Sequence, residues 1–222
     1  MMNMKRFQTH QVSKEIERRL EESRFNPEAV NLRLKKAAEL ADAKENEKVL
    51  DLGCGNSKIL KFLPTVEYTG IDYKPARTKS FADDPPDKIF RRNNVINHNL
   101  ERGLPSQIRK KKFDIIFMLE FLEHIENFRT LVMQCGQILS EGGRIIISTP
   151  SNMRLVVFPH GEGHDHIHCF RKTNLNNLAR ICGLKMTAFK GTFIWIPILH
   201  TFISSDQTWY MDFFLVKFEK IR

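Results

Sequence analysis

The sequence predicts an α/β fold, namely a Rossmann-like, doubly wound, mostly parallel seven-stranded sheet with an antiparallel edge strand and helices on both faces. Three observations predict it. Short apolar runs recur along the chain, helical patterns lie between most of them, and a glycine-rich turn in VLDLGCGNS follows the first run. Strands that alternate with helices indicate a parallel sheet with right-handed crossovers. Runs without polar alternation, such as IIF and IIIS, indicate strands buried on both faces.

Two helices are expected before the first strand. Residues 11–24 have the composition of a polar helix, which Pro27 interrupts. The next stretch, NPEAVNLRLKKAAELADA, gathers its apolar residues on one face of a second helix, with Asn26 as N-cap and Pro27 at the first helical position. We therefore expect residues 1–46 to form an N-terminal helical lid on a ligand-binding domain at residues 47–222.

From Lys48 onward, predicted strands and helices alternate. The expected strands are, in order, KVLDLG, VEYTGID, VINHNL, FDIIFML and RIIISTP, followed by two β-rich runs, KMTAFKGTFIWI and WYMDFFLVKFEK. The expected helices are SKILKFL, ENFRTLVMQCGQILS and TNLNNLARICGL, the last with Thr173 as its cap and Gly183 at its end. Two prolines indicate a loop over residues 82–94. No clear helix separates the last two strands, so a hairpin at the sheet edge is expected, with one strand antiparallel to the rest.

Composition indicates a globular chain with an excess of positive charge. The 222 residues carry a net charge of +9, and the densest basic cluster is RKKK at residues 109–112. This run is either a solvated loop or a contact for nucleic acid, an anionic membrane surface or a phosphorylated glycan. The four cysteines form no CxxC pair and are expected to be free thiols. A signal-like segment is lacking and no apolar run approaches the roughly 20 residues of a membrane span, so a cytoplasmic protein without a transmembrane segment is expected.

The turn after the first predicted strand indicates the kind of ligand. Gly53 and Gly55 lie where such sheets bind ligands, and Asp72, at the end of the second strand, suits the two hydroxyls of a ribose. A dinucleotide fingerprint fails, because its third glycine position holds Lys58. Asp51 would repel a pyrophosphate but suits a cationic amino-acid tail, so the turn indicates S-adenosyl-L-methionine rather than NAD. The glycines would leave room for this ligand, and we expect Gly53→Val to abolish binding while leaving the fold largely intact.

Residues 48–184 resemble the class I S-adenosylmethionine-dependent methyltransferases. VLDLGCGNS is similar to their first motif, with Ser57 where many members have a third glycine, and YTGIDYKP is similar to their second. FDIIFMLEFLEHIENF and ILSEGGRIIISTPSN resemble the regions of their fourth and fifth strands. The nearest subgroup includes the ubiquinone-type O-methyltransferases and the methyltransferases of surface-glycan pathways. The resemblance implies a methyltransferase domain at residues 47–222 that binds S-adenosyl-L-methionine and methylates a small-molecule or glycan acceptor at oxygen.

The resemblance also implies a cofactor site at the ends of the first four strands. Its expected members are Asp51, Gly53 and Gly55 at the methionine part and ribose, Asp72 at the ribose hydroxyls, Tyr73 and Asn99 at the adenine, and Met118 and Glu120 at the end of the fourth strand. Asn99 stands where the family pattern has an aspartate. Its side-chain carbonyl can still accept a hydrogen bond from the adenine amino group.

The stretch Glu120-x-x-Glu123-His124 is the first candidate for chemistry. It follows the fourth strand, and so it faces the mouth of the expected pocket. His124 is the candidate general base, since histidine titrates near neutral pH. In a second interpretation, Glu123 and His124 order the turn and cap the next helix. In a third, which the ubiquinone-type enzymes suggest, Glu120, Glu123 and His124 bind a divalent metal such as Mg²⁺.

A histidine-rich stretch, PHGEGHDHIHCF, is the second candidate. Its members are His160, His164, His166 and His168. The alternatives are histidines of a structural or substrate-covering loop, a catalytic histidine at His164 or His168, and a zinc site. Zinc is the least favoured of the three.

Two further functions would account for the positive charge. They are an RNA-directed methyltransferase and a nucleic-acid-binding protein with a vestigial cofactor pocket. The intact Asp51 and Asp72 argue against a vestigial pocket. LEFLEH stands where many methyltransferases of base amino groups have an (N/D)PP(F/Y) loop, which argues against methylation of such groups but not of other RNA targets.

Overall fold

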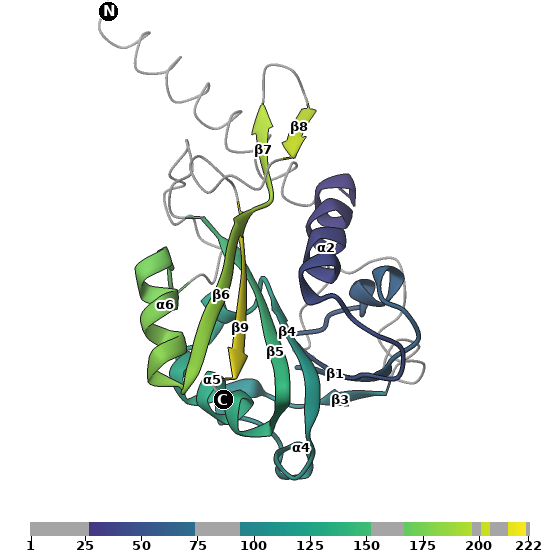
Figure 1. The fold of residues 1–222 in the computed structure, drawn as a ribbon, viewed down its shortest axis with the longest axis vertical. Coiled ribbons are helices and arrows are strands. Elements are labelled where there is room, and N and C mark those ends of the chain that lie inside the picture. Colours follow the sequence, from purple (N-terminus) through teal and green to yellow (C-terminus); the bar gives the residue numbers. More distant parts are fainter. Residues whose placement is uncertain (1–26, 74–93, 152–166, 197–200, 205–212, 221–222) are drawn as a thin grey trace, which may run out of the picture.

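The computed structural model describes residues 27–73, 94–151, 167–196, 201–204 and 213–220, with only the backbone described at 193–196 and 201–204. Figure 1 shows one twisted sheet with helices on either side. The predicted helix at 11–24, most of the predicted loop at 82–94 and most of the histidine-rich stretch lie outside the described residues.

The central sheet has seven strands in the order β3-β2-β1-β4-β5-β9-β6. Their bounds are β1 Lys48–Leu52, β2 Glu67–Asp72, β3 Val95–Asn97, β4 Phe113–Leu119, β5 Leu139–Pro150, β6 Leu184–Gly191 and β9 Phe213–Lys220. Neighbours from β3 to β5 pair in parallel, whereas β9 is antiparallel to both β5 and β6. The predicted mostly parallel sheet with an antiparallel strand at one edge is confirmed. At this edge β6 is the outermost strand. The antiparallel strand β9 is next to it, between β6 and β5.

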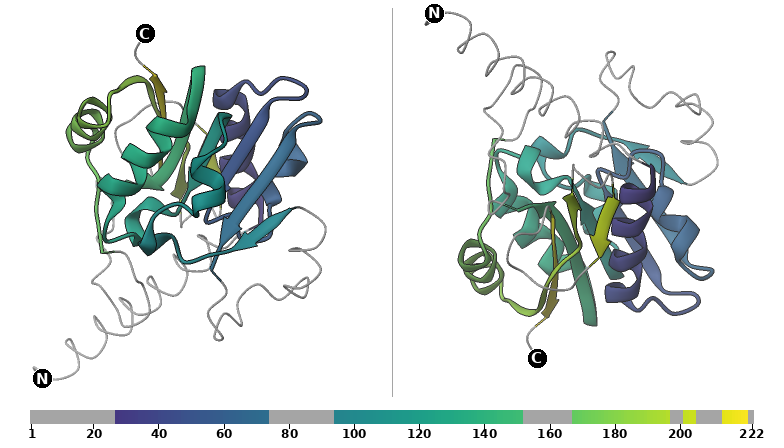
Figure 2. Two further views of the ribbon diagram at one scale, coloured as in Figure 1. Left: turned by 90° about the horizontal axis from the view of Figure 1, so that it is seen from below. Right: turned by 90° about the horizontal axis from the view of Figure 1, so that it is seen from above.

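Helices cover both faces of the sheet, as predicted (Figure 2). The helical segments are α2 Pro27–Ala41, η1 Lys58–Phe62, η2 Leu100–Arg102, α4 Ser106–Arg109, η3 Leu122–His124, α5 Phe128–Ile138 and α6 Lys172–Ile181. The alanine-rich face of α2 and the side chain of Ile59 pack with Val49, Ile115 and Phe117 on one side of the sheet. Apolar residues of α4, α5 and α6 pack on the opposite side. The sheet is therefore buried on both faces, which accounts for its strands without polar alternation.

Several element boundaries differ from the predictions. The helix α6 begins at Lys172 rather than after Thr173, because the Asn174 side chain accepts the Arg171 N–H at 3.1 Å and fixes the first turn two residues earlier. Gly183 ends this helix with φ +69°, as predicted. The predicted helix SKILKFL is a short 3₁₀ segment. The fifth strand begins at Leu139 and not at residue 144, since Leu139 already pairs with the start of β4.

The β-rich run at residues 185–196 divides into two strands at Thr192. This side chain is fully buried, and its hydroxyl donates to the Phe213 carbonyl at 3.3 Å. Beyond it, β7 (Phe193–Ile196) leaves the main sheet and pairs with β8 (Thr201–Ser204) in a separate two-stranded antiparallel ribbon. The ribbon extends past the end of the main sheet in Figure 1.

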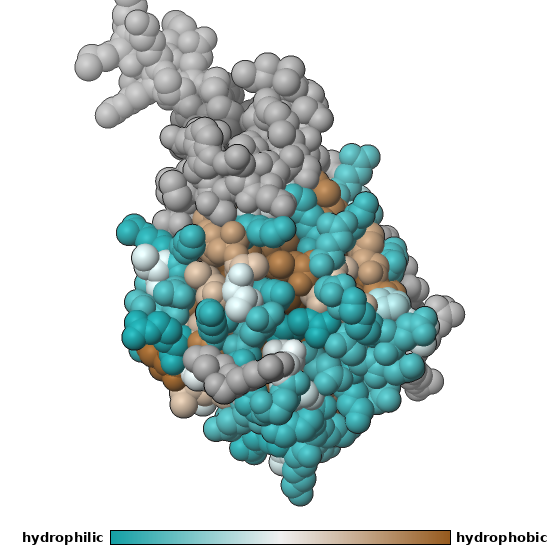
Figure 3. Space-filling model, in the orientation of Figure 1, coloured by the Kyte–Doolittle hydropathy of each residue, from teal (hydrophilic) through white to brown (hydrophobic). Residues whose placement is uncertain are grey.

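The basic run at residues 109–112 lies at the end of α4, directly before β4. All four side chains are exposed, and the Lys112 ammonium donates to the Gln137 carbonyl at 2.7 Å. The surface towards this end of the molecule is largely hydrophilic in Figure 3. Because the run precedes β4, it lies at the opposite end of the strand from the predicted cofactor turn. Among the described residues, none of the helices has the length and apolar character needed to cross a bilayer.

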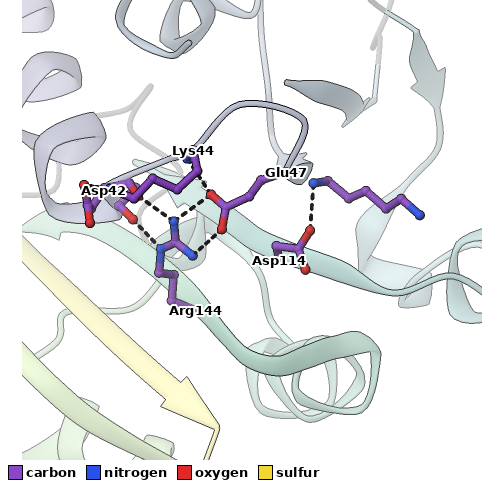
Figure 4. Close-up of polar contacts among 7 residues, drawn as sticks. Asp42, Lys44, Glu47, Asp114 and Arg144 are labelled. Carbon is purple, nitrogen blue, oxygen red and sulfur yellow. Dashed lines mark hydrogen bonds and ion pairs between the residues drawn. The ribbon is translucent and has the colours of Figure 1, made fainter. Parts of the chain in front are cut away.

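An arginine of β5 holds the end of α2 against the sheet (Figure 4). The Arg144 guanidinium donates to both carboxylate oxygens of Glu47, at 2.9 and 2.8 Å, and to the carbonyls of Ala41 and Asp42. The Arg144 and Glu47 side chains are only 13% and 20% exposed. A bidentate, mostly buried pair of this kind resists solvent screening better than a surface ion pair does.

We expect Arg144→Met to lower the free energy of unfolding by about 1–3 kcal/mol, because Glu47 and two carbonyls lose a partner together. Lys44→Met is the matched control, since Lys44 pairs only with the exposed Asp42 and should change stability by less than about 0.5 kcal/mol. Urea unfolding of the three proteins measures the difference. Equal stability of both variants would show that the Arg144 contacts do not hold α2.

Candidate cofactor site

The predicted glycine turn lies at the carboxyl end of β1, between the ends of β2 and β4. Both glycines have left-handed backbone conformations, with φ +70° at Gly53 and +50° at Gly55. The Gly53 N–H donates to the Ile71 carbonyl at 2.8 Å, which ties the turn to the end of β2. Glycine is favoured at such φ values because it has no Cβ.

The two glycines have different surroundings. A Cβ added to Gly55 would meet no described residue within 4 Å, so this position opens onto free space in the part of the chain that the structure describes, as expected for a ligand-facing glycine. A Cβ added to Gly53 would lie only 2.3 Å from Cδ2 of Phe121, which packs over the turn. The expectation that Gly53→Val would spare the fold is therefore wrong. Valine there would displace the Phe121 ring and would also be strained by the positive φ.

Asp51 is buried within the site. Its side chain is in β1, the residue is only 4% exposed, and its Oδ2 accepts a hydrogen bond from the Tyr68 hydroxyl at 2.8 Å. Burial raises the pKa of Asp51 to about 7, the nearby charge of Asp72 adds to the rise, and the Tyr68 hydrogen bond opposes it. A buried carboxylate of this kind would gain from a cationic ligand group.

Asp72 closes the turn from the end of β2. Its two carboxylate oxygens accept the Gly55 N–H at 2.5 Å and the Tyr73 N–H at 2.7 Å. Burial raises the pKa of Asp72, and these two backbone hydrogen bonds work against the rise. Asp72 therefore lies beside the glycine that opens onto free space, as the prediction of a ribose contact requires.

A cavity of about 300 Å³ adjoins Asp72. It is lined by Tyr73, Asn97, His98, Asn99 and Arg102, so two of the residues predicted to contact adenine meet there. The Tyr73 side chain is 53% exposed, which leaves its ring accessible to a base. The side-chain carbonyl of Asn99, Oδ1, already accepts the Glu101 N–H at 3.0 Å and caps η2. A second lone pair remains on that oxygen.

Ser57 lies at the position where the family resemblance implies a third glycine. Its backbone is left-handed, with φ 56° and ψ 31°, and the residue is buried. A left-handed non-glycine residue costs about 1–2 kcal/mol.

We expect Ser57→Gly to stabilise the protein by about 0.5–1 kcal/mol, less than the full strain because glycine also gains entropy in the unfolded chain. Thermal denaturation without cofactor measures the gain, with Ser57→Ala as the comparison that removes the hydroxyl but keeps the strain. A destabilised glycine variant would show that the hydroxyl matters more than the backbone conformation.

Glu120 lies at the rim of the site, but it is held by protein groups. It has φ +51°, and its N–H and Oε1 both bond to the hydroxyl of Ser148 at the end of β5, at 3.0 and 2.9 Å. Its Oε2 lies 3.8 Å from a guanidinium nitrogen of Arg33 in α2. Arg33 also stacks over the Phe213 ring at 4.7 Å, and its buried Nε has no hydrogen-bond partner within the described part of the chain.

Arg33 is the residue that the sequence predictions missed. Its side chain is only 12% exposed. The signal was present, since Arg33 is four residues from both Ala29 and Ala37, which are buried against the sheet. A charge on the apolar face of a helix indicates a function or a buried partner.

The predicted cofactor contact Met118 does not reach the open part of the site. Met118 is fully buried in the core on the α5 side.

The Glu120-x-x-Glu123-His124 stretch does not form a metal site, because Glu120 faces Ser148 and Arg33 whereas Glu123 is wholly buried. Within the residues that the structure describes, no group of three or more metal-ligating side chains comes together. The expectation of a divalent metal is unsupported.

Of the four histidines in the histidine-rich stretch, only His168 is described. Its ring packs edge-on against Phe128 at 4.7 Å and lies 6.0 Å from the Phe170 ring, and its buried Nε2 has no hydrogen-bond partner among the described residues. These contacts are those of a half-buried histidine in an aromatic cluster. His160, His164 and His166 lie outside the described residues, so neither the zinc alternative nor His164 as base is tested.

Comparison with known proteins agrees with this geometry. The family described as a methyltransferase domain matches residues 9–188. The ubiquinone biosynthesis O-methyltransferase of Bordetella avium is 28% identical over 198 residues, which cover 77% of this chain and 76% of the relative. That of Proteus mirabilis is 28% identical over 151 residues, 65% of this chain, and the match spans only 57% of the relative's length.

Solved structures show the same fold. An S-adenosylmethionine-dependent methyltransferase of Thermotoga maritima, described as a possible histamine N-methyltransferase, superimposes with a TM-score of 0.64 at 16% identity over 94% of this chain and 96% of that one. The N-methyltransferase NodS of Bradyrhizobium japonicum gives a TM-score of 0.57 at 16% identity over 89% and 99%. Because the family match extends over most of the chain and the sheet carries its cofactor motifs at the expected strand ends, the protein belongs to the S-adenosylmethionine-dependent methyltransferases.

Proposed function

We propose that the protein transfers a methyl group from S-adenosyl-L-methionine to an oxygen atom of a small-molecule acceptor. The observation that supports it best is the meeting of Asp51, the open Gly55 and Asp72 at the ends of two adjacent parallel strands. The names of the curated relatives, which are O-methyltransferases, support oxygen as the target. A glycan acceptor, an RNA acceptor and a non-catalytic nucleic-acid-binding role have no comparable support.

The described residues fit the cofactor's separate chemical groups. The buried Asp51 carboxylate would pair with the ammonium of the methionine tail. Arg33, whose Nε has no hydrogen-bond partner among the described residues, would take the carboxylate of that tail. Asp72 would accept the ribose hydroxyls beside Gly55. Tyr73 and Asn99 would hold the adenine in the adjoining cavity. Both charges of the ligand's amino-acid tail would then meet an opposite charge that is largely removed from water.

The cofactor supplies an electrophilic methyl group on a sulfonium. The chain has to align an acceptor oxygen with that group and remove the proton of the acceptor. His124, half-buried at the end of η3, is the proposed base. Ser148 and Arg33 fix the Glu120 carboxylate, so Glu120 would act by shaping the rim. We propose that residues 1–46 form the lid, with α2 contributing Arg33, and that the protein is cytoplasmic.

Cofactor binding provides the direct test. By calorimetry, S-adenosyl-L-methionine should bind and NAD should not. We expect Asp72→Ala to weaken binding by about 10- to 100-fold, because a charge-assisted contact to ribose hydroxyls is worth about 1.5–3 kcal/mol. Asp114→Ala is the matched control, since that carboxylate accepts the Lys48 N–H at the other end of the sheet. Equal affinities of the two variants would contradict the proposed site.

The acceptor is tested separately with a panel of phenolic, alcoholic and amine small molecules, together with glycans and RNA. Transfer of a radiolabelled methyl group to hydroxyl compounds alone would support the proposal. Labelling of RNA, or of amines in preference to hydroxyls, would overturn the assignment of the acceptor while leaving the cofactor site in place.

A further inference from the structure

Asp51 is held by a tyrosine from the neighbouring strand. In the β1–β2 pairing, Tyr68 lies opposite Val49, and Asp51 lies opposite Gly70. The Tyr68 ring therefore extends along the sheet to the Asp51–Gly70 pair, two residues further on, where its hydroxyl donates to Oδ2 of Asp51 at 2.8 Å. The hydroxyl occupies one carboxylate oxygen and leaves the other for a ligand.

Gly70 provides the room for this reach. A Cβ added there would lie 2.8 Å from Sγ of Cys54, 3.1 Å from Cγ2 of Val95 and 3.2 Å from Cε1 of Tyr68. These three atoms occupy the space that any side chain at residue 70 would need. Glycine weakens a strand interior and is expected there only where other groups approach closely. One of the groups that approach is the Tyr68 ring, which contacts Asp51 through its hydroxyl.

We propose that Tyr68, given room by Gly70, is a positioning residue for cofactor binding, because it fixes the Asp51 carboxylate in the orientation that receives the ammonium of the ligand's amino-acid tail. This inference rests on the proposed function. It assigns a role to two β2 residues outside the glycine turn, neither of which would touch the ligand.

The contact also controls the charge of Asp51. Two titratable groups act on it, namely Tyr68 in β2 and Asp72 at the end of β2, and its own charge raises the pKa of the Cys54 thiol in the turn. The partner of Asp51 in β4 is the apolar Phe117. Burial and the Asp72 charge favour the protonated form, and the Tyr68 hydroxyl favours the ionised form. Removal of the hydroxyl should raise the pKa of Asp51 above about 7 and leave less carboxylate at neutral pH.

The experiment measures the affinity for S-adenosylhomocysteine by calorimetry from about pH 5.5 to about pH 9 in the wild type and Tyr68→Phe. This probe has the ammonium without the sulfonium. In the wild type, affinity should rise with pH as Asp51 ionises, with a midpoint near 7. In Tyr68→Phe the midpoint should move up by about one pH unit, so that affinity at pH 7 falls about fivefold and recovers at high pH. Gly70→Ala, which pushes the ring away, should move the midpoint in the same direction.

Two controls separate positioning from folding. 5′-Methylthioadenosine has no amino-acid tail, so its affinity should not follow the ionisation of Asp51 and should be equal in the wild type and Tyr68→Phe. Asp51→Asn should remove the pH dependence of the homocysteine compound. An unmoved midpoint in Tyr68→Phe, or an equal loss of both probes at every pH, would overturn the inference alone. Failure of the wild type to bind either probe would overturn the proposed function and the inference with it.

Discussion

Asp51→Asn is expected to weaken cofactor binding and at the same time to stabilise the cofactor-free protein. Loss of the charge-assisted contact to the ligand's ammonium should lower affinity by about 10- to 100-fold, corresponding to about 1.5–3 kcal/mol. Stability should change in the opposite direction. An asparagine carbonyl can still accept the Tyr68 hydroxyl, and the amide carries no charge to bury.

The sign of the stability effect follows from the pKa of Asp51. Its carboxyl has a pKa of about 7 in the folded protein, whereas the ordinary pKa of an aspartate, which applies to the unfolded chain, is 3.8. Between these values the folded chain binds more protons than the unfolded chain, so stability falls as the pH rises from about 4 to about 7 and stays lower above. A shift of about three units amounts to roughly 4 kcal/mol.

Thermal denaturation without cofactor at pH 5 and pH 8 tests this prediction. The gain from Asp51→Asn should be small at pH 5 and large at pH 8. Asp114→Asn, at the other end of the sheet, should show no such gain. An Asp51→Asn protein that is less stable than the wild type at pH 8 would mean that the carboxylate has a stabilising partner in the folded chain.

The fold could be predicted because each of its main elements has a local signal. The strands are short apolar runs buried on both faces, and the turn of Gly53 and Gly55 follows the first of them. The strand order and the place of β9 next to the edge depend on contacts between segments distant in sequence. No local pattern in β9 distinguishes a strand inside the edge from the edge strand itself.

The sequence could predict only those site residues whose positions follow from the ends of the strands. Asp51 and Asp72 meet at the turn because parallel strands bring their carboxyl ends together. The reason for Gly53 was misjudged, since sequence shows that a glycine is needed but not that Phe121, 68 residues later, lies over it. Arg33 was missed because its partners are Glu120, the residue after β4, and Phe213 at the start of β9.

Packing was a better guide than histidine density. His168 belongs to the stretch that suggested zinc or a second base, yet its ring packs edge-on against Phe128 with the Phe170 ring close by, and its Nε2 is buried. A base must reach its substrate within hydrogen-bond distance. His124 remains half-buried in η3, directly after the strand that ends at the site.

We therefore expect His124→Ala to lower turnover by about 100-fold or more, the usual contribution of a general base, with little change in cofactor affinity. His124→Gln, which keeps size and polarity but cannot accept a proton effectively, should lose turnover to the same extent. Single-turnover rates with saturating acceptor, together with calorimetry for the cofactor, separate a chemical defect from a folding defect.

His168→Leu is the matched control, because it replaces a histidine packed against the Phe128 ring with an apolar side chain. It should keep its turnover, whereas His124→Ala should not. The opposite pattern would move the base to the loop before α6, and loss of turnover in His164→Ala alone would place it at His164. If all three variants kept their turnover, alignment of the acceptor with the sulfonium would be sufficient for transfer. The buried charges of Asp51 and Arg33, which hold the ligand's tail, would then carry the protein's main contribution to catalysis.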